Sequence, residues 1–93
     1  MHSTIRVKKL NNEIRKNGFT YRLVERTETK AIYAQDDFAF EVFKIKLGRP
    51  HPLSDEDIKN FDKIERFPND EAFGKIAWTY RTLEDARKKY AMI

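Results

Sequence analysis

The chain contains no cysteine. This absence excludes disulfide bonds, zinc sites with thiolate ligands, iron–sulfur clusters and cysteine nucleophiles. Only three glycines and three prolines occur in 93 residues, and they form no glycine-rich phosphate-binding loop. No apolar run approaches the roughly 20 residues that a membrane-spanning helix requires, so we expect a protein without a membrane span.

Recognisable catalytic motifs are missing as well. The sequence has no GxSxG, HExxH or DxDxDG pattern. His2 and His51 are far apart, and the acidic side chains at 55–57 are adjacent, so on a helix they diverge instead of converging on one ion. We therefore predict that the protein is not an enzyme and that it has no catalytic residue, no metal site and no cofactor.

The composition supports one folded domain over residues 1–93. The chain is 40% hydrophobic, which is enough for a core, and its length fits one domain. Charged residues make up 37% of the sequence, so we expect a surface dense in both signs. No secretory signal is recognised at the N-terminus, and we expect a cytoplasmic protein.

The first half of the sequence predicts one helix followed by strands. Val7, Leu10 and Ile14 recur at helical spacing and predict a helix over residues 4–17, with Gly18 as its C-terminal stop. Alternating patterns predict strands over 19–26, 30–35 and 38–47. The last of these changes phase near Phe43, which indicates a bulge or two partly covered faces.

The second half predicts two further helices and one more strand. A helix is expected from Ser54 to a point before Pro68, a strand over 75–80 and a helix over 82–93. The predicted fold class is therefore α+β in the order α-β-β-β-α-β-α. Short connections favour a mainly antiparallel four-stranded sheet with about three helices.

Charge is unevenly distributed along the chain. Residues 1–30 contain eight Lys or Arg and three Asp or Glu, residues 49–73 contain four and seven, and residues 74–93 contain five and two. Both terminal helices are thus expected to be basic, and on one side of the sheet they would form a single surface for a partner or a nucleic acid. The candidate binding residues are Lys8, Lys9, Asn12, Arg15, Lys16, Arg87, Lys88 and Lys89.

Twelve aromatic residues are a high number for a chain of 93 residues. Most aromatics on strands of a small sheet belong to its core. We expect this of Phe19, Phe38, Phe40, Phe43 and Trp78. Tyrosine is enriched at binding hot spots, although a tyrosine can equally pack its ring and keep its hydroxyl in water. The tyrosines considered for a contact site are Tyr21, Tyr33 and Tyr80.

Three stretches of the sequence carry a resemblance. They are Phe40-Glu-Val-Phe-Lys-Ile45, Phe67-Pro-Asn-Asp-Glu-Ala-Phe-Gly-Lys-Ile-Ala-Trp-Thr-Tyr80 and the predicted helix at 83–90. Together they resemble small accessory proteins encoded by bacterial phages and conjugative elements, over about half of the chain. That size class includes inhibitors of host defence, among them anti-CRISPR proteins. The resemblance implies a stand-alone binding protein with no chemistry of its own.

Two functions follow from these observations as alternatives. The first is a phage-type accessory protein that binds and inhibits a host defence machine, with a nucleic-acid-handling ribonucleoprotein effector as the expected target. The second is a regulator that binds RNA or DNA without sequence preference through its basic terminal helices. The expected partner is a host protein or ribonucleoprotein, and direct contact with RNA is left open. We expect no association with a membrane, and we expect the protein to be a monomer or a homodimer.

Overall fold

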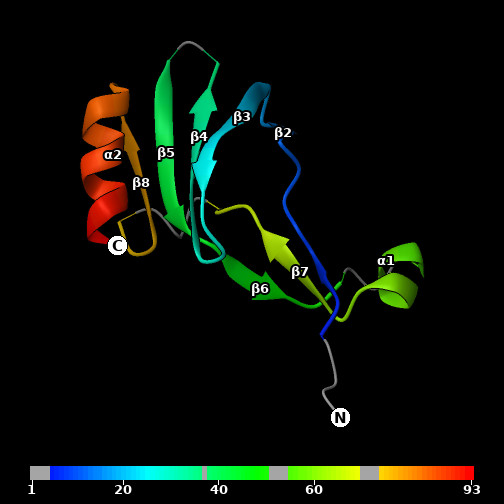
Figure 1. Cartoon of the computed structure of the whole chain (residues 1–93). Helices are drawn as coiled ribbons and strands as arrows, with labels where there is room; N and C mark the ends of the chain where they lie inside the picture. The colour runs from blue at the N-terminus through cyan, green and yellow to red at the C-terminus, as the bar shows by residue number, and fades with distance from the viewer. Residues whose placement is uncertain (1–4, 37, 51–54, 70–73) are drawn as a thin grey trace. The chain divides into compact units, whose positions relative to one another are not determined.

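The chain forms two compact units in the computed structural model (Figure 1). The small unit combines residues 1–10 with 46–67, and the large unit combines residues 11–45 with 68–93. Each unit is thus assembled from segments that are distant in sequence. The structure describes residues 5–36, 38–50, 55–69 and 74–93. The single domain expected from the composition stays a prediction.

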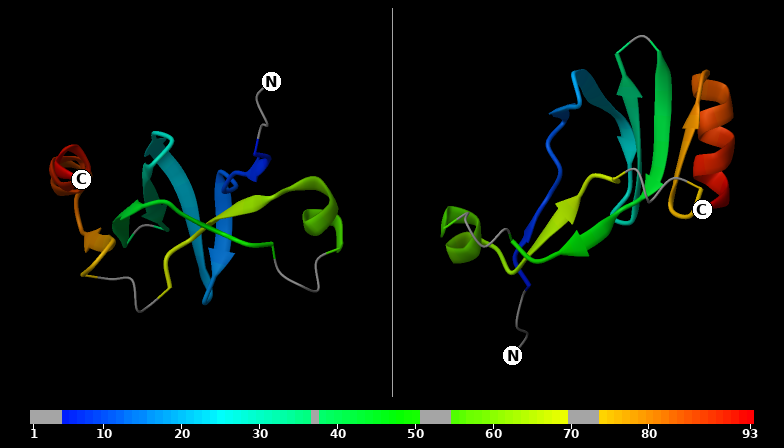
Figure 2. Two further views of the ribbon diagram at one scale, coloured as in Figure 1. Left: turned by 90° about the horizontal axis from the view of Figure 1, so that it is seen from below. Right: turned by 180° about the vertical axis from the view of Figure 1, so that it is seen from behind.

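The large unit is an antiparallel sheet with one helix. Its five strands follow the order β2-β3-β4-β5-β8. They are β2 (Glu13–Lys16), β3 (Phe19–Arg26), β4 (Lys30–Gln35), β5 (Ala39–Lys44) and β8 (Ala77–Tyr80). Helix α2 (Leu83–Met92) lies on one face of this sheet at the end formed by β5 and β8 (Figures 1 and 2).

A two-residue turn joins β2 to β3. Asn17 and Gly18 both have positive φ, at 54° and 81°, as the type I′ turn of a hairpin requires. Lys16 and Phe19 flank the turn as a paired position of the ladder. Asn-Gly is favoured here because both residues tolerate the left-handed region, where a β-carbon normally clashes with the backbone.

Two more turns complete the meander of β3, β4 and β5. At the first, the Thr27 amide donates to the Lys30 carbonyl at 2.8 Å, and the Thr29 amide donates to the Thr27 hydroxyl at 3.2 Å. At the second, Asp36 adopts a φ of 46° and its carboxylate accepts from the Thr20 amide at 3.3 Å. Short polar side chains therefore satisfy the backbone at each reversal.

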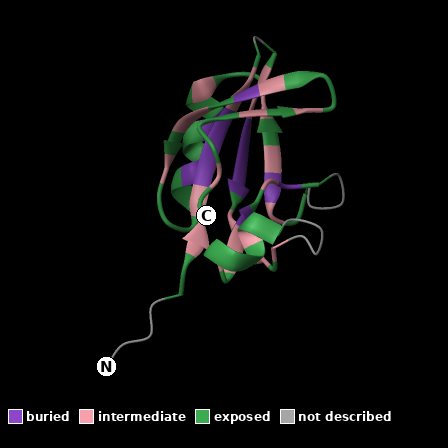
Figure 3. Ribbon diagram, turned by 90° about the vertical axis from the view of Figure 1, so that its right-hand side faces the viewer, coloured by how far each residue is buried: buried purple, intermediate pink, exposed green. Residues whose placement is uncertain are grey.

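The two central strands are buried on both faces. On the face below α2, Ile32 and Val42 pack with Ala86 and Tyr90. On the opposite face, the buried rings of Tyr33 and Phe43 stack on each other, with their centroids 5.7 Å apart. Figure 3 shows the buried positions gathered on the inner strands and on one side of the helix. Burial of these large side chains is the main stabilising term of the unit.

Both ends of α2 are capped. The Thr82 hydroxyl accepts from the Asp85 amide at 3.2 Å, as an N-cap does. At the other end, the Lys30 ammonium donates to the carbonyl oxygens of Tyr90 at 2.7 Å and Ile93 at 3.3 Å. A cation at this position also interacts favourably with the negative end of the helix dipole. These contacts fix the helix on β4.

The small unit has a three-stranded sheet and one short helix. The strand order is β1-β7-β6, with β1 parallel and β6 antiparallel to the central strand. The elements are β1 (Val7–Lys8), β6 (Lys46–Gly48), α1 (Asp55–Asn60) and β7 (Lys63–Arg66). Gly48 lies against the Arg66 side chain, which would have to move aside for a β-carbon at this position.

Polar contacts hold much of the small unit together. The Asp62 carboxylate accepts from the Arg6 amide at 2.9 Å and forms an ion pair with its guanidinium at 3.5 Å. Hydrogen bonds from the Arg6 backbone and side chain lower the pKa of Asp62. The Glu65 carboxylate accepts from the Leu10 amide at 2.8 Å. Among the described residues of this unit, Glu65 alone is buried, so apolar burial contributes less here than in the large unit.

The predicted fold is right in class and wrong in architecture. The structure is α+β, but it has two sheets, of three and five strands, where one four-stranded sheet was expected. Its described residues contain two helices instead of about three. The predicted helix over 4–17 is replaced by β1 and β2, because Asn17-Gly18 forms a hairpin turn and because Val7 and Ile14 pair within two different sheets.

The middle helix and the long strand also differ from expectation. Helix α1 ends at Asn60, and Ile64, expected on that helix, lies in β7. The strand predicted over 38–47 divides at Ile45 into β5 and β6, which belong to different sheets. The change of phase at Phe43 lies inside β5 and has another cause: Val42 and Phe43 are both fully buried on opposite faces of the strand, so both faces are covered and no bulge is needed. The predicted cap at Ser54 lies outside the described residues.

The remaining elements confirm their predictions closely. The strands expected over 19–26 and 30–35 are β3 and β4. The strand expected over 75–80 is present as β8 over its last four residues, and the C-terminal helix expected over 82–93 is α2. In these segments the turn residues, the periodicity and the helix cap all indicate the same structure.

Replacing Gly18 by alanine tests the hairpin turn. A β-carbon at Gly18 meets no atom within 4 Å, so the cost is conformational. We expect Gly18→Ala to lower the free energy of unfolding by about 1–2 kcal/mol, measured by urea denaturation. Gly18→Asn is the matched control, and it should cost less despite its larger side chain because asparagine tolerates positive φ. Equal stability of the alanine variant and the parent would contradict the turn.

Alkaline unfolding tests the packing of Tyr90. Burial raises the pKa of the Tyr90 hydroxyl above its usual value, and the nearby Glu25 carboxylate acts in the same direction. Its contribution to stability is therefore complete below about pH 10 and is lost as the pH rises through the raised pKa. Tyr90→Phe removes the hydroxyl's hydrogen bond with Thr27 and should cost about 1 kcal/mol at pH 8.

We expect this difference in stability to narrow above pH 10. The parent protein then loses the contribution of Tyr90 as its hydroxyl ionises, whereas the phenylalanine variant has no group to ionise at this position. Urea unfolding followed by Trp78 fluorescence measures it at each pH. A difference that stays constant up to the highest pH at which both proteins fold would show that Tyr90 is not buried as described.

Candidate functional site

The predicted basic residues are divided between the two units. Lys8 and Lys9 belong to the small unit, and the other six belong to the large unit. The Lys8 ammonium lies 3.1 Å from both carboxylate oxygens of Asp57 on α1. Lys9 follows β1 and is exposed. The basic face expected on a helix over 4–17 is therefore wrong, because that segment is not helical.

The next three candidates lie at the start of the large unit. Asn12 is exposed, and its carbonyl accepts from the Leu23 amide at 2.8 Å. Arg15 and Lys16 are neighbours on β2 and so point to opposite faces of the sheet. Arg15 is exposed, whereas the half-buried Lys16 donates to the Pro68 carbonyl at 2.7 Å. These residues do not form one basic stripe.

The last three candidates lie on α2 but diverge around it. Arg87 points toward β3, where its Nε lies 3.4 Å from a carboxylate oxygen of Glu25. Lys88 pairs with Glu84 one turn earlier at 3.7 Å. Both pairs are well exposed, so each contributes little to stability. They do, however, neutralise part of the positive charge on the helix.

Lys89 occupies the opposite flank of α2 from Arg87. Its ammonium lies 4.1 Å from the centroid of the Trp78 ring, in a cation–π contact. Trp78 belongs to β8 and is half-buried on the face of the sheet below α2. The contact holds the lysine beside the last strand of the sheet.

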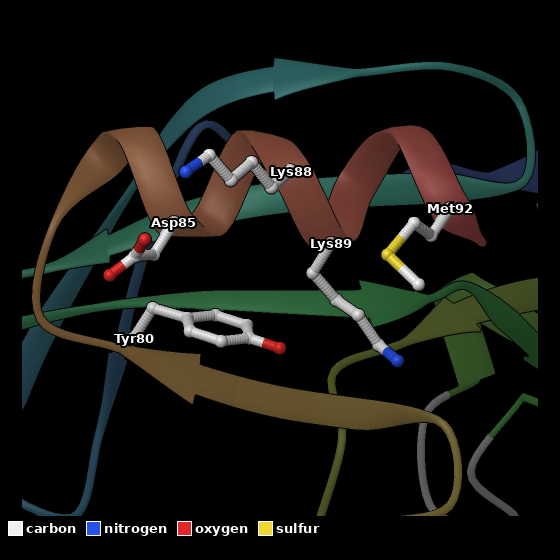
Figure 4. Close-up of a pocket in the computed structure, with 5 residues that line it drawn as sticks. All are labelled: Tyr80, Asp85, Lys88, Lys89 and Met92. Atoms are coloured by element: carbon white, nitrogen blue, oxygen red, sulfur yellow. The ribbon is translucent and has the colours of Figure 1, made fainter.

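A hollow of about 310 Å³ lies between α2 and β8 (Figure 4). Its lining residues on the helix recur at a spacing of three or four and so share one flank. The five lining residues, which we name the α2–β8 surface, are Tyr80, Asp85, Lys88, Lys89 and Met92. Figure 4 shows Lys89 and Met92 projecting from the helix toward β8.

The α2–β8 surface combines two side chains that are typical of protein interfaces with three charged ones. It offers an aromatic ring at Tyr80, a flexible apolar side chain at Met92, two cations and one acid. Met92 is 77% exposed, although it is one of the larger apolar residues of the chain. Aromatic residues and methionine are enriched in protein interfaces. Tyr80 and Met92 are therefore the two lining residues of types that are common in protein interfaces.

Of the three tyrosines considered for a contact site, the structure leaves Tyr80 available. Tyr21 is 5% exposed and Tyr33 is fully buried, with its hydroxyl donating to the Asn11 carbonyl at 2.7 Å. Tyr80 is half-buried and lines the hollow. Met92 and Asp85 were not predicted. The sequence could have indicated that Met92 is exposed, because this residue lies off the apolar stripe of its own helix.

Two phenylalanines expected in the core lie at the surface. Phe19 is 37% exposed and Phe38 is 69% exposed, and their rings meet edge to face at 6.1 Å. Both flank hairpin turns at one end of the sheet, beyond the area that α2 covers. Phe43 is buried as predicted, and Phe40 and Trp78 are partly buried against the core.

Acidic and metal-ligating residues do not gather in the described part of the chain. No group of three or more His, Asp or Glu residues there could hold a metal ion. The acidic first turn of α1 is Asp55, Glu56 and Asp57, and the last of these pairs with Lys8. His2 and His51 lie outside the described residues. The absence of a catalytic, metal or cofactor site stays a prediction.

Comparisons with known proteins identify no relative. None of the helices in the described residues has the length and apolar character needed to cross a membrane. No family model, no curated protein and no solved structure matches this chain.

Proposed function

We propose that this is a non-enzymatic accessory protein that docks on a larger partner through the α2–β8 surface. The expected partner is a nucleic-acid-handling effector of a bacterial host's defence, which the protein inhibits in the cytoplasm. The resemblance of the sequence to phage-encoded accessory proteins supports the class of partner. The observation that carries the proposal is the exposed Met92 beside Tyr80, Lys88 and Lys89 around one hollow.

Protein docking is preferred to non-specific nucleic-acid binding because the candidate cations already have partners. Lys8 pairs with Asp57, and Arg87 pairs with Glu25. Lys16 donates to a backbone carbonyl. Non-specific binding depends on cations that replace the counterions of phosphate, and here several would first have to leave an internal contact. The eight candidates are also divided between two units and several faces.

Charge reversal at the hollow tests the proposal. We expect the double variant Lys88→Glu/Lys89→Glu to lose at least about tenfold in affinity for the partner, or about 1.4 kcal/mol. The measurement is affinity capture from nuclease-treated bacterial lysate, followed by titration of the captured protein against both forms. Circular dichroism confirms that the variant folds.

The double variant Lys46→Glu/Lys59→Glu is the matched control. It changes the net charge equally at exposed positions of the small unit, and it should bind the partner like the parent. Lys46 and Lys59 lie outside the basic terminal segments, so a nucleic-acid-binding protein is distinguished by what it captures: without nuclease it would recover nucleic acid, and the recovery would fall as salt rises. Recovery of nucleic acid without a protein partner, in a parallel capture that omits the nuclease, would overturn the proposed function.

A further inference from the structure

In the described part of the chain, β8 is an edge strand, and some of its backbone groups face away from β5. β8 is the last strand of its sheet, with β5 as its neighbour. The Lys44 amide donates to the Ile76 carbonyl at 2.8 Å, and Phe43 pairs with Ala77 in the register. In an antiparallel ladder, this arrangement turns the backbone groups of every second residue away from the neighbouring strand. On β8, the outward residues are Ala77 and Thr79.

One of these outward groups already has a partner. The Ala77 carbonyl accepts from the Gly74 amide at 2.8 Å in the turn that precedes the strand. Within the described residues, no backbone hydrogen bond reaches the Thr79 amide or carbonyl from the open side. An added strand would therefore find a donor and an acceptor at Thr79 and a further donor at the Ala77 amide.

The sequence of β8 lacks the charged residues and the proline that protect many edge strands. Proteins usually protect an exposed edge strand with charged residues or proline. The opposite edge of the same sheet, β2, follows this rule, because three of its four residues are charged. β8 consists of Ala, Trp, Thr and Tyr and has neither a charge nor a proline. The two edges of one sheet thus differ in the property that controls strand addition.

We propose that the β8 edge takes up an extended, acidic segment of the partner protein as an additional strand. This inference rests on the proposed function and specifies how that docking occurs. Side chains of an added strand alternate between the two faces of the sheet, so every second residue would enter the hollow below α2. Lys88 and Lys89 line that hollow and would attract carboxylates at those positions.

Charge also decides between a partner and a second copy of this chain. Pairing two β8 edges would bring the same flank of α2, with Lys88 and Lys89, toward its own symmetry mate. Like charges at a contact oppose association, and Asp85 is the single acid that lines the hollow. An acidic segment from another protein carries no such penalty. Recognition by an added strand combines backbone hydrogen bonds for affinity with side-chain pockets for specificity.

Selection from a displayed library of random nine-residue peptides tests this inference with the intact protein. We expect enriched peptides to be acidic, with Asp or Glu at every second position and β-branched residues between them. Their affinity should fall at least tenfold for Lys88→Glu/Lys89→Glu and remain unchanged for Lys46→Glu/Lys59→Glu. Enrichment of basic peptides, or of none, would overturn the inference.

Methylation of the peptide backbone tests strand addition without altering the protein. An N-methyl group removes one amide donor, and in a ladder every second amide of the peptide faces β8. Methylating each position of an enriched peptide in turn should therefore abolish binding at every second position and leave it unchanged at the positions between. Affinity that ignores the position of the methyl group would overturn strand addition. If the lysine variant still loses the captured partner in that case, the proposed function stands and only the added strand is wrong.

Discussion

The structure depends on the burial of β4 and β5 on both faces. Ile32 and Val42 face the helix, while Tyr33 and Phe43 fill the opposite side, and all four are fully buried. Consecutive large apolar residues cannot alternate between core and water, so both faces of the central strands must be covered. Helix α2 covers one of them, fixed at its C-terminus by Lys30. The position of the helix follows from this requirement.

The same constraint places the candidate binding groups at the margins of the large unit. The helix turns its apolar stripe inward, which leaves one flank beside β8 and the other toward β3. Lys89 and Met92 lie on the β8 flank, next to the last strand of the sheet. Docking at this margin requires no opening of the core, since the side chains and the free edge already face outward.

The sequence predicts the structure well where local and long-range signals agree. Strands β3 and β4 and helix α2 match their expected ranges because periodicity, turns and the Thr82 cap coincide. The N-terminal segment was misjudged because Val7 and Ile14 have helical spacing, although Asn17-Gly18 is a strong hairpin signal. The α2–β8 surface could be predicted only in its helical lysines and in Tyr80, because the strand order that makes β8 an edge is not visible in periodicity.

Hydrogen exchange at the Thr79 amide, followed with the purified partner by NMR or by mass spectrometry, reports directly on whether a strand is added to β8. In the free protein this amide should exchange rapidly, since it faces the open side of β8, whereas the neighbouring Trp78 amide pairs with β5. Strong protection of the Thr79 amide is expected when the partner is bound. Unchanged exchange at Thr79, with new protection at the Phe19 and Phe38 end of the sheet or in the small unit, would contradict it.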